Sequence, residues 1–183
     1  MKNLLQKKSS VYDLCIMAAF TAIIAVMAQI IIPMPYGVPM TLQTLAIALA
    51  GVMLGAKKGT ISTVLYVLLG AVGAPVFAGL TGGFGIVFGP TGGFILSFPL
   101  LALAAGMGAE KNNKWWLWGG LVIGVVVNYL CGIIYYSIVT SNDLITSFFA
   151  CVLFFIPTDI IKIIIAGLFG IKVRKLLFQR NVV

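Results

Sequence analysis

Residues 59–109 read GTISTVLYVLLGAVGAPVFAGLTGGFGIVFGPTGGFILSFPLLALAAGMGA and contain no charged side chain. Residues 14–56 and 115–142 are also free of Asp, Glu, Lys and Arg. Since one membrane crossing takes roughly 20 apolar residues, residues 14–56 and 59–109 must each hold a pair of helices. Of the 183 residues, 61% are hydrophobic and 9% are charged, which leaves too few polar groups to cover a soluble domain. The sequence therefore predicts an all-α, polytopic membrane protein.

Basic side chains lie in clusters at the boundaries of these apolar runs. The net charge is +8, and eleven of the 12 Lys and Arg residues belong to four clusters: Lys2/Lys7/Lys8, Lys57/Lys58, Lys111/Lys114 and Lys172/Arg174/Lys175/Arg180. Such clusters beside apolar runs are typical of cytoplasmic loops and do not indicate a nucleic-acid surface. They predict cytoplasmic termini and one domain, residues 1–183, with six transmembrane helices over about 12–32, 40–56, 59–77, 91–108, 115–139 and 156–177.

The segments between these spans carry turn signals. The first span has flanks like those of a signal peptide, but its apolar region is longer than a signal core, so we expect a retained helix. Residues 33–39 contain three prolines and predict an external loop. Residues 78–93 are glycine-rich but lack the ending of a phosphate-binding loop, and they predict an external or re-entrant loop with close backbone packing. Residues 144–155 are too short to cross and return, which predicts a short helix or apolar loop over the outer end.

The segment Phe154–Lys162 holds the only Asp and the only Lys within strongly apolar sequence. Pro157 suits the first turn of a helix. Asp159 then lies at the electropositive helix start, with Lys162 three residues later on the same face. An ion pair inside a membrane indicates a functional site. The alternative is a structural pair that locks this helix to its neighbours.

Further polar residues are expected near the same outer face. Asn128 lies within a long apolar run, and Thr41 and Gln43 stand at the start of the second span. We expect Thr41 to share one helical face with Thr44 and Leu45, with Gln43 displaced from it. The alternative is that these groups only meet water at the membrane surface.

Residues and motifs suited to catalysis are scarce in this sequence. It has no histidine, four acidic residues and no nucleotide-binding motif, so we expect no enzyme, no metal site and no cofactor. Cys15, Cys131 and Cys151 are widely spaced and fit small hydrophobic residues. What remains is binding: a pocket for a small polar ligand, in which Asp159 accepts hydrogen bonds and Lys162 donates them.

Four motifs carry a family resemblance across nearly the whole chain. They are Val38–Leu45 (VPMTLQTL), Gly73–Gly79 (GAPVFAG) with Gly82 and Gly83, Gly89–Phe94 (GPTGGF) and Pro157–Lys162 (PTDIIK). In this order and spacing they resemble the biotin-specific substrate-binding subunits (S components, BioY family) of energy-coupling-factor transporters. Thr158 departs from the family pattern, in which glycine is expected.

The resemblance implies biotin as the ligand, held near the external face of a multi-pass protein in a prokaryotic plasma membrane. It implies a first external loop, with Tyr36 and Gly37, that acts as a lid, and an alanine pair, Ala18 and Ala22, that contacts a transmembrane coupling subunit. Two cytoplasmic ATPase subunits would hydrolyse the ATP, and membrane lipids surround the helices. The substrate-binding residues that it implies are Asp159, Lys162, Asn128, Gln43, Thr41 and Phe77.

Two other functions stay open at this point. One is the same class of transporter subunit with another vitamin, such as riboflavin or thiamine. The other is a membrane interaction subunit without a ligand, in which Asp159 and Lys162 only bind helices together.

Overall fold

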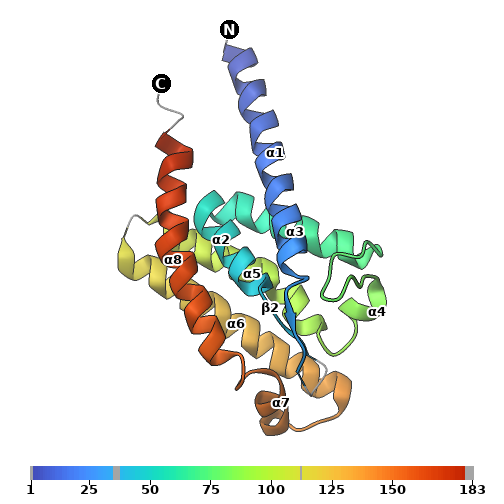
Figure 1. Cartoon of the computed structure of the whole chain (residues 1–183). Helices are drawn as coiled ribbons and strands as arrows, with labels where there is room; N and C mark the ends of the chain where they lie inside the picture. Colours follow the sequence, from blue (N-terminus) through green and yellow to red (C-terminus); the bar gives the residue numbers. More distant parts are fainter. Residues whose placement is uncertain (1, 35–37, 112, 180–183) are drawn as a thin grey trace.

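The computed structural model is an almost wholly helical bundle (Figure 1), as the sequence predicted. It describes residues 2–34, 38–111 and 113–179, and of residues 2–10 and 177–179 the backbone alone. Both ends of the described chain lie at the same end of the bundle, and helix α7 lies at the opposite end. The elements are α1 Lys2–Met27, β1 Ile31–Ile32, β2 Met40–Thr41, α2 Gln43–Leu54, α3 Ala56–Ala71, α4 Phe84–Val87, α5 Gly92–Glu110, α6 Lys114–Thr140, α7 Leu144–Cys151 and α8 Ile156–Gln179.

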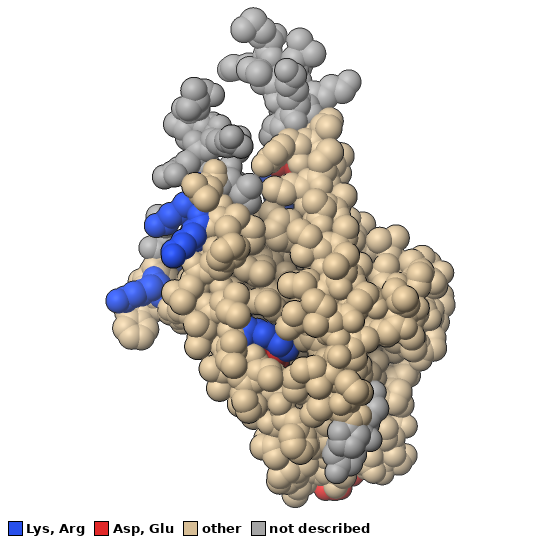
Figure 2. Space-filling model, viewed as in Figure 1, with Lys and Arg blue, Asp and Glu red and all other residues tan. Residues whose placement is uncertain are grey.

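Long apolar helices supply the membrane-crossing part of the bundle. By length and composition α5 and α6 could each cross a membrane, and α7 with α8, which are bent by 57° at a short break, could form a third crossing among the described residues. Residues 11–27 and α2 are shorter apolar helices. The number of six spans and the cytoplasmic side of the termini therefore stay predictions. Figure 2 shows Lys and Arg side chains gathered near the end where both termini lie.

Helix α5 lies in the middle of the bundle, in contact with α2, α3 and α6. Its contact with α6 is close because glycines face each other there. A Cβ atom built on Gly120 of α6 would overlap the carbonyl oxygen of Ala104 and lie 3.0 Å from the Cα atom of Gly108 in α5. Small residues of this kind allow helix backbones in a membrane to approach one another.

The first helix ends at Met27, earlier than the predicted limit near residue 32. Pro33 disfavours a helical conformation for the residue before it, and Ile31–Ile32 instead pairs as β1 with β2 in antiparallel register, Ile31 opposite Thr41 and Ile32 opposite Met40. Thr41 therefore lies in a strand, and its predicted place on a helical face with Thr44 and Leu45 is wrong. The strand pairing satisfies backbone groups that the apolar surroundings would otherwise leave unpaired.

Two segments between long helices contain short helices. Residues 78–93 include α4, and a bridge joins Phe77 to Thr81 just before it. Residues 144–155 form α7, the short helix that the sequence allowed for. Asp143 caps α7 by accepting a hydrogen bond from the Thr146 backbone N–H (3.3 Å). The Thr146 side chain and backbone N–H together lower the pKa of the Asp143 carboxyl below its usual value.

The α5–α6 contact gives a stability prediction. Gly120→Val would place a branched side chain against the α5 backbone, at a cost of about 1–3 kcal/mol, and lower the Tm of the detergent-solubilised protein by about 5 °C. Gly119→Val is the matched control, because a Cβ atom on Gly119 meets no described atom within 4 Å. Equal melting temperatures for the two variants would contradict a glycine-dependent contact.

Candidate functional site

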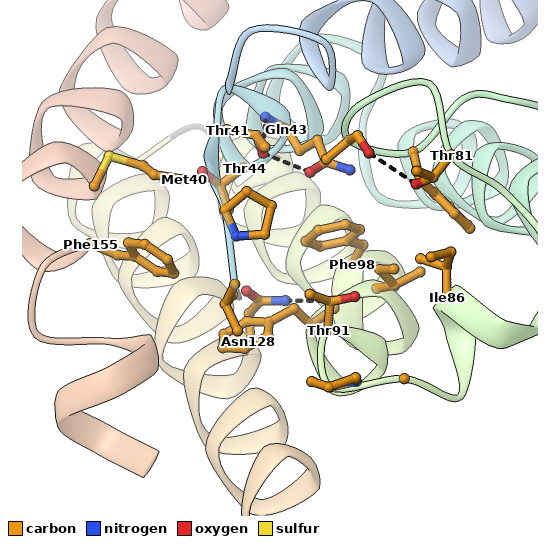
Figure 3. Close-up of a pocket in the computed structure, with 18 of the residues that line it drawn as sticks. Met40, Thr41, Gln43, Thr44, Thr81, Ile86, Thr91, Phe98, Asn128 and Phe155 are labelled. Carbon is orange, nitrogen blue, oxygen red and sulfur yellow. Dashed lines mark hydrogen bonds between the residues drawn. The ribbon is translucent and has the colours of Figure 1, made fainter. Parts of the chain in front are cut away.

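A cavity of about 310 Å³ lies among β2, α2, α4, α5, α6 and α8, at the lower end of the range of small-molecule pockets, about 300–1,000 Å³. Figure 3 shows Thr41 and Gln43 at one end of it, Asn128 at the other, and Phe98 between them. The described residues that line it are Val38, Pro39, Met40, Thr41, Gln43, Thr44, Phe77, Ala78, Thr81, Gly85, Ile86, Gly89, Pro90, Thr91, Phe94, Ile95, Phe98, Asn128, Tyr129, Phe155, Asp159 and Lys162.

Asp159 and Lys162 form the predicted ion pair in the cavity wall. Asp159 lies in the first turn of α8, and Lys162 Nζ is 2.6 Å from its Oδ1 atom. The side chains are 5% and 9% exposed, respectively. Lys162 also donates to the Thr41 carbonyl (2.8 Å) and to the Thr44 hydroxyl (3.2 Å). Because an ammonium group has three N–H donors, each donor of Lys162 has a protein acceptor.

Two partners of Asp159 were not among the predicted site residues. The Thr44 hydroxyl donates to Oδ1 (3.1 Å), and the Tyr129 hydroxyl donates to Oδ2 (2.6 Å). A carboxylate offers about four lone-pair sites, and Oδ1 already takes two of the donors while Oδ2 takes one. Oδ2 therefore keeps room for one more donor from a ligand.

Asn128 is 1% exposed and stands at the other end of the cavity. Its Nδ2 atom donates to the Phe94 carbonyl (3.0 Å) and to the Ser97 hydroxyl (2.8 Å). Both N–H groups of the amide are thus engaged by α5. The group that Asn128 can still offer a ligand is its carbonyl oxygen, which is an acceptor.

Gln43 belongs to a hydrogen-bonded chain along the cavity wall. The Thr41 hydroxyl donates to Gln43 Oε1 (2.6 Å), and Gln43 Nε2 donates to the Tyr66 hydroxyl (2.6 Å). The Tyr66 hydroxyl in turn donates to the Val76 carbonyl (3.1 Å). Gln43 is 6% exposed, so the alternative that it only meets water at the membrane surface is wrong.

Phe77 supplies apolar wall beside this chain. Its ring meets the Tyr66 ring edge to face, with centroids 5.6 Å apart. The same ring lies directly on Gly70 of α3, where a Cβ atom would overlap it. Phe77 is consequently fixed by close packing, with 1% of its surface exposed.

All six predicted substrate-binding residues line this one cavity: Thr41, Gln43, Phe77, Asn128, Asp159 and Lys162. Ala18 and Ala22 are exposed on α1, outside this wall. Tyr36 and Gly37, the predicted lid residues, lie outside the described residues. The Thr158 hydroxyl donates to the Phe155 carbonyl (2.9 Å), so the departure from the family pattern is accommodated within the first turn of α8.

The missed residues could not be found from local patterns. Tyr66, Thr44 and Tyr129 contact partners 10 to 118 positions away, and one of these partners is a backbone carbonyl. In the described part of the chain, no three Cys, Asp or Glu side chains come together as a metal site would require.

Comparisons with known proteins agree with this geometry. The sequence model of the BioY family matches residues 1–179. The chain belongs to the BioY family. A "Biotin transporter BioY" of Thermotoga maritima is 38% identical over 88% of this chain and 95% of its own length. A "Probable biotin transporter BioY" of Bacillus subtilis is 34% identical over 90% and 91%.

A solved structure extends the likeness from sequence to fold. The crystal structure of "the S-component for biotin from an ECF-type ABC transporter" superposes with a TM-score of 0.83 at 31% identity, covering 92% of this chain and 93% of that one. The resemblance deduced from the four motifs is thereby confirmed. This chain is a membrane protein of a transporter family and not an enzyme.

The ion pair gives a prediction for the protein without ligand. Lys162→Met leaves the Asp159 carboxylate buried without a cation, which costs about 3–5 kcal/mol. The double variant Asp159→Asn/Lys162→Met removes both charges and should melt at a higher temperature than Lys162→Met alone. Thermal unfolding in detergent measures this difference, and a double variant no more stable than Lys162→Met would contradict the buried-charge explanation.

Proposed function

We propose that this BioY-family chain binds biotin with high affinity and serves as the substrate-binding subunit of an energy-coupling-factor uptake transporter. The observation that carries the proposal is the cavity wall. Residues from all four motifs of the family resemblance line this one pocket. Asp159 and Lys162 form the one ion pair found among its described lining residues. The relatives named for biotin transport and the likeness to a biotin S component support the same ligand.

The ureido ring of biotin suits the acceptors that the wall leaves open. The ring carries two N–H donors, and the pocket offers the free lone pair of Asp159 Oδ2 and the amide oxygen of Asn128. The ring also carries one carbonyl acceptor, which the second N–H of Gln43 can serve because the first is engaged by Tyr66. A pocket with such fixed polar groups rejects analogues that lack the matching groups.

Lys162 has a supporting role in this proposal. Its donors are engaged by Asp159, Thr44 and the Thr41 carbonyl, so it orients the Asp159 carboxylate instead of bonding to the ligand. A charged acceptor makes a stronger hydrogen bond than a neutral one. Phe77 and the other aromatic rings of the wall would cover the apolar part of the ligand.

Transport requires an energy source, which we place on other subunits. Two cytoplasmic ATPase subunits would hydrolyse ATP, and a transmembrane coupling subunit would link them to this chain. We propose that the coupling subunit contacts the face of α1 that holds Ala18 and Ala22. Both alanines are exposed, and they lie four residues apart between Leu14 and Val26, which are 60% and 66% exposed. Small residues in this arrangement allow close helix packing.

Biotin binding to the purified chain is the direct test. Titration calorimetry in detergent should give saturable binding to the unmodified protein. Asp159→Asn should weaken binding by about 10- to 100-fold, because a charged hydrogen-bond acceptor is lost. Asp143→Asn is the matched control, an exposed aspartate that caps α7 away from the cavity.

Other outcomes of this titration separate the competing functions. Tight binding of riboflavin or thiamine without binding of biotin would assign another vitamin. No saturable binding of any of the three would favour an interaction subunit without a ligand. Binding of biotin at unchanged affinity in a folded Asp159→Asn variant would remove Asp159 from the site.

The α1 face gives a separate prediction about transport. Ala22→Leu should leave biotin binding by the isolated chain unchanged, since Ala22 lies outside the cavity wall. The larger side chain should reduce ATP-driven biotin uptake into proteoliposomes that also contain the coupling and ATPase subunits, because it holds the helices apart. Uptake at the unmodified rate would contradict a coupling contact at this face.

A further inference from the structure

One wall of the cavity is a tight turn in the segment between α3 and α4. Phe77, Ala78 and Thr81 line the cavity from this turn. The Phe77 N–H donates to the Thr81 carbonyl (2.9 Å), which closes the turn. Gly79 and Leu80 between them both have positive φ, +73° and +55°. A left-handed conformation is unfavourable for leucine, so contacts from outside the turn must hold it.

Gln29, just beyond the end of α1, makes those contacts. The two N–H donors of its Nε2 atom are shared among three carbonyl oxygens, two of which belong to Val76 (3.3 Å) and Phe77 (3.1 Å). Its Oε1 atom accepts from the Leu80 N–H (2.8 Å). One side chain thus satisfies backbone donors and acceptors on both sides of the turn, as a neighbouring strand would do. Gln29 itself lies outside the described cavity wall.

The amide of Gln29 is also anchored to its own helix. Nε2 donates to the Ala25 carbonyl in the last turn of α1 (3.0 Å). The position of the turn at residues 76–81 therefore follows the outer end of α1. The Val76 carbonyl is shared with the Tyr66 hydroxyl, which leads through Gln43 to Thr41 in β2.

The chain that follows Gln29 leads to a second cavity wall. Ile31 and Ile32 pair with Thr41 and Met40, both of which line the cavity. The Thr41 carbonyl accepts from Lys162, the partner of Asp159. Within four residues of the end of α1, the chain thus contacts two walls of the pocket.

We propose that Gln29 is a positioning residue: it fixes the wall formed by Phe77, Ala78 and Thr81 to the outer end of α1, so that displacement of α1 loosens the ligand. The part of this inference that concerns the ligand rests on the proposed biotin function. The geometry of the pocket then depends on Gln29, a residue that does not touch the ligand. It also makes α1, which carries the exposed Ala18–Ala22 face, a direct support of the pocket.

Gln29→Met tests the inference, because methionine keeps the length and volume of the side chain and removes its hydrogen bonds. We expect the dissociation constant for biotin to rise about 10-fold, mainly through faster dissociation. Hydrogen exchange of the backbone amides in residues 76–81 should accelerate in the absence of ligand, because the Leu80 N–H loses its acceptor.

Thr21→Val is the matched control on the same helix. The Thr21 hydroxyl donates to the Ser62 carbonyl of α3 (2.9 Å), away from the cavity, and the residue is 6% exposed. This variant should lose stability without a change in biotin dissociation or in exchange at residues 76–81. The control therefore shows whether a general loss of stability alone could produce the faster dissociation and faster exchange expected for Gln29→Met.

The two readouts separate this inference from the proposed function. Unchanged biotin dissociation and unchanged amide exchange in Gln29→Met would overturn the role of Gln29 while leaving biotin binding intact. Faster exchange with unchanged dissociation would overturn the link to the ligand. If the unmodified protein bound no biotin, the proposed function would fall, and amide exchange would still decide whether Gln29 holds the turn.

Discussion

The buried contact between Lys162 and Asp159 is the interaction on which the pocket depends. A charged pair in apolar surroundings is tolerated where hydrogen bonds saturate it, and here Lys162 binds β2 through the Thr41 carbonyl while Tyr129 of α6 binds Asp159. The pair thereby joins α8 to a strand and two helices. These bonds fix the direction of the Asp159 carboxylate before any ligand arrives. Pre-organisation of this kind reduces the side-chain entropy that the protein must lose when a ligand binds.

Saturation also determines what the pocket can recognise. The donors of Lys162 and of the Asn128 amide are all engaged within the protein, whereas Asp159 Oδ2 and the Asn128 oxygen still have lone pairs. Asp159 and Asn128 therefore act on a ligand as hydrogen-bond acceptors. A ring with two N–H groups matches them, and a ligand that presents only acceptors does not. Specificity thus arises from the groups that the protein leaves unpaired.

The sequence was sufficient to predict the class of protein, the ion pair and the set of six residues that line the cavity. Charge-free runs and the i, i+3 spacing of Asp159 and Lys162 are local patterns, and the four motifs identified the family. The rest depends on contacts far apart in the chain. Gln29 bonds to Phe77, which is 48 positions away in the chain. Its partners are backbone atoms, and a contact with the backbone cannot be recognised from the types of the residues involved. The early end of α1 escaped prediction because strand pairing replaced helical hydrogen bonds after Met27.

The opposite end of the bundle uses its charges differently. Glu110 accepts the Ala56 N–H at the start of α3 (2.9 Å), and Arg174 donates to the Val52 carbonyl at the end of α2 (3.0 Å). These charged side chains cap helix ends at the turn around Gly55, whose φ of +87° and close contact with Glu110 require glycine. Helices α2, α3, α5 and α8 are therefore bound together at the end where the termini lie. At the other end two of the cavity walls, β2 and the turn at residues 76–81, are joined to α1 by strand and side-chain hydrogen bonds.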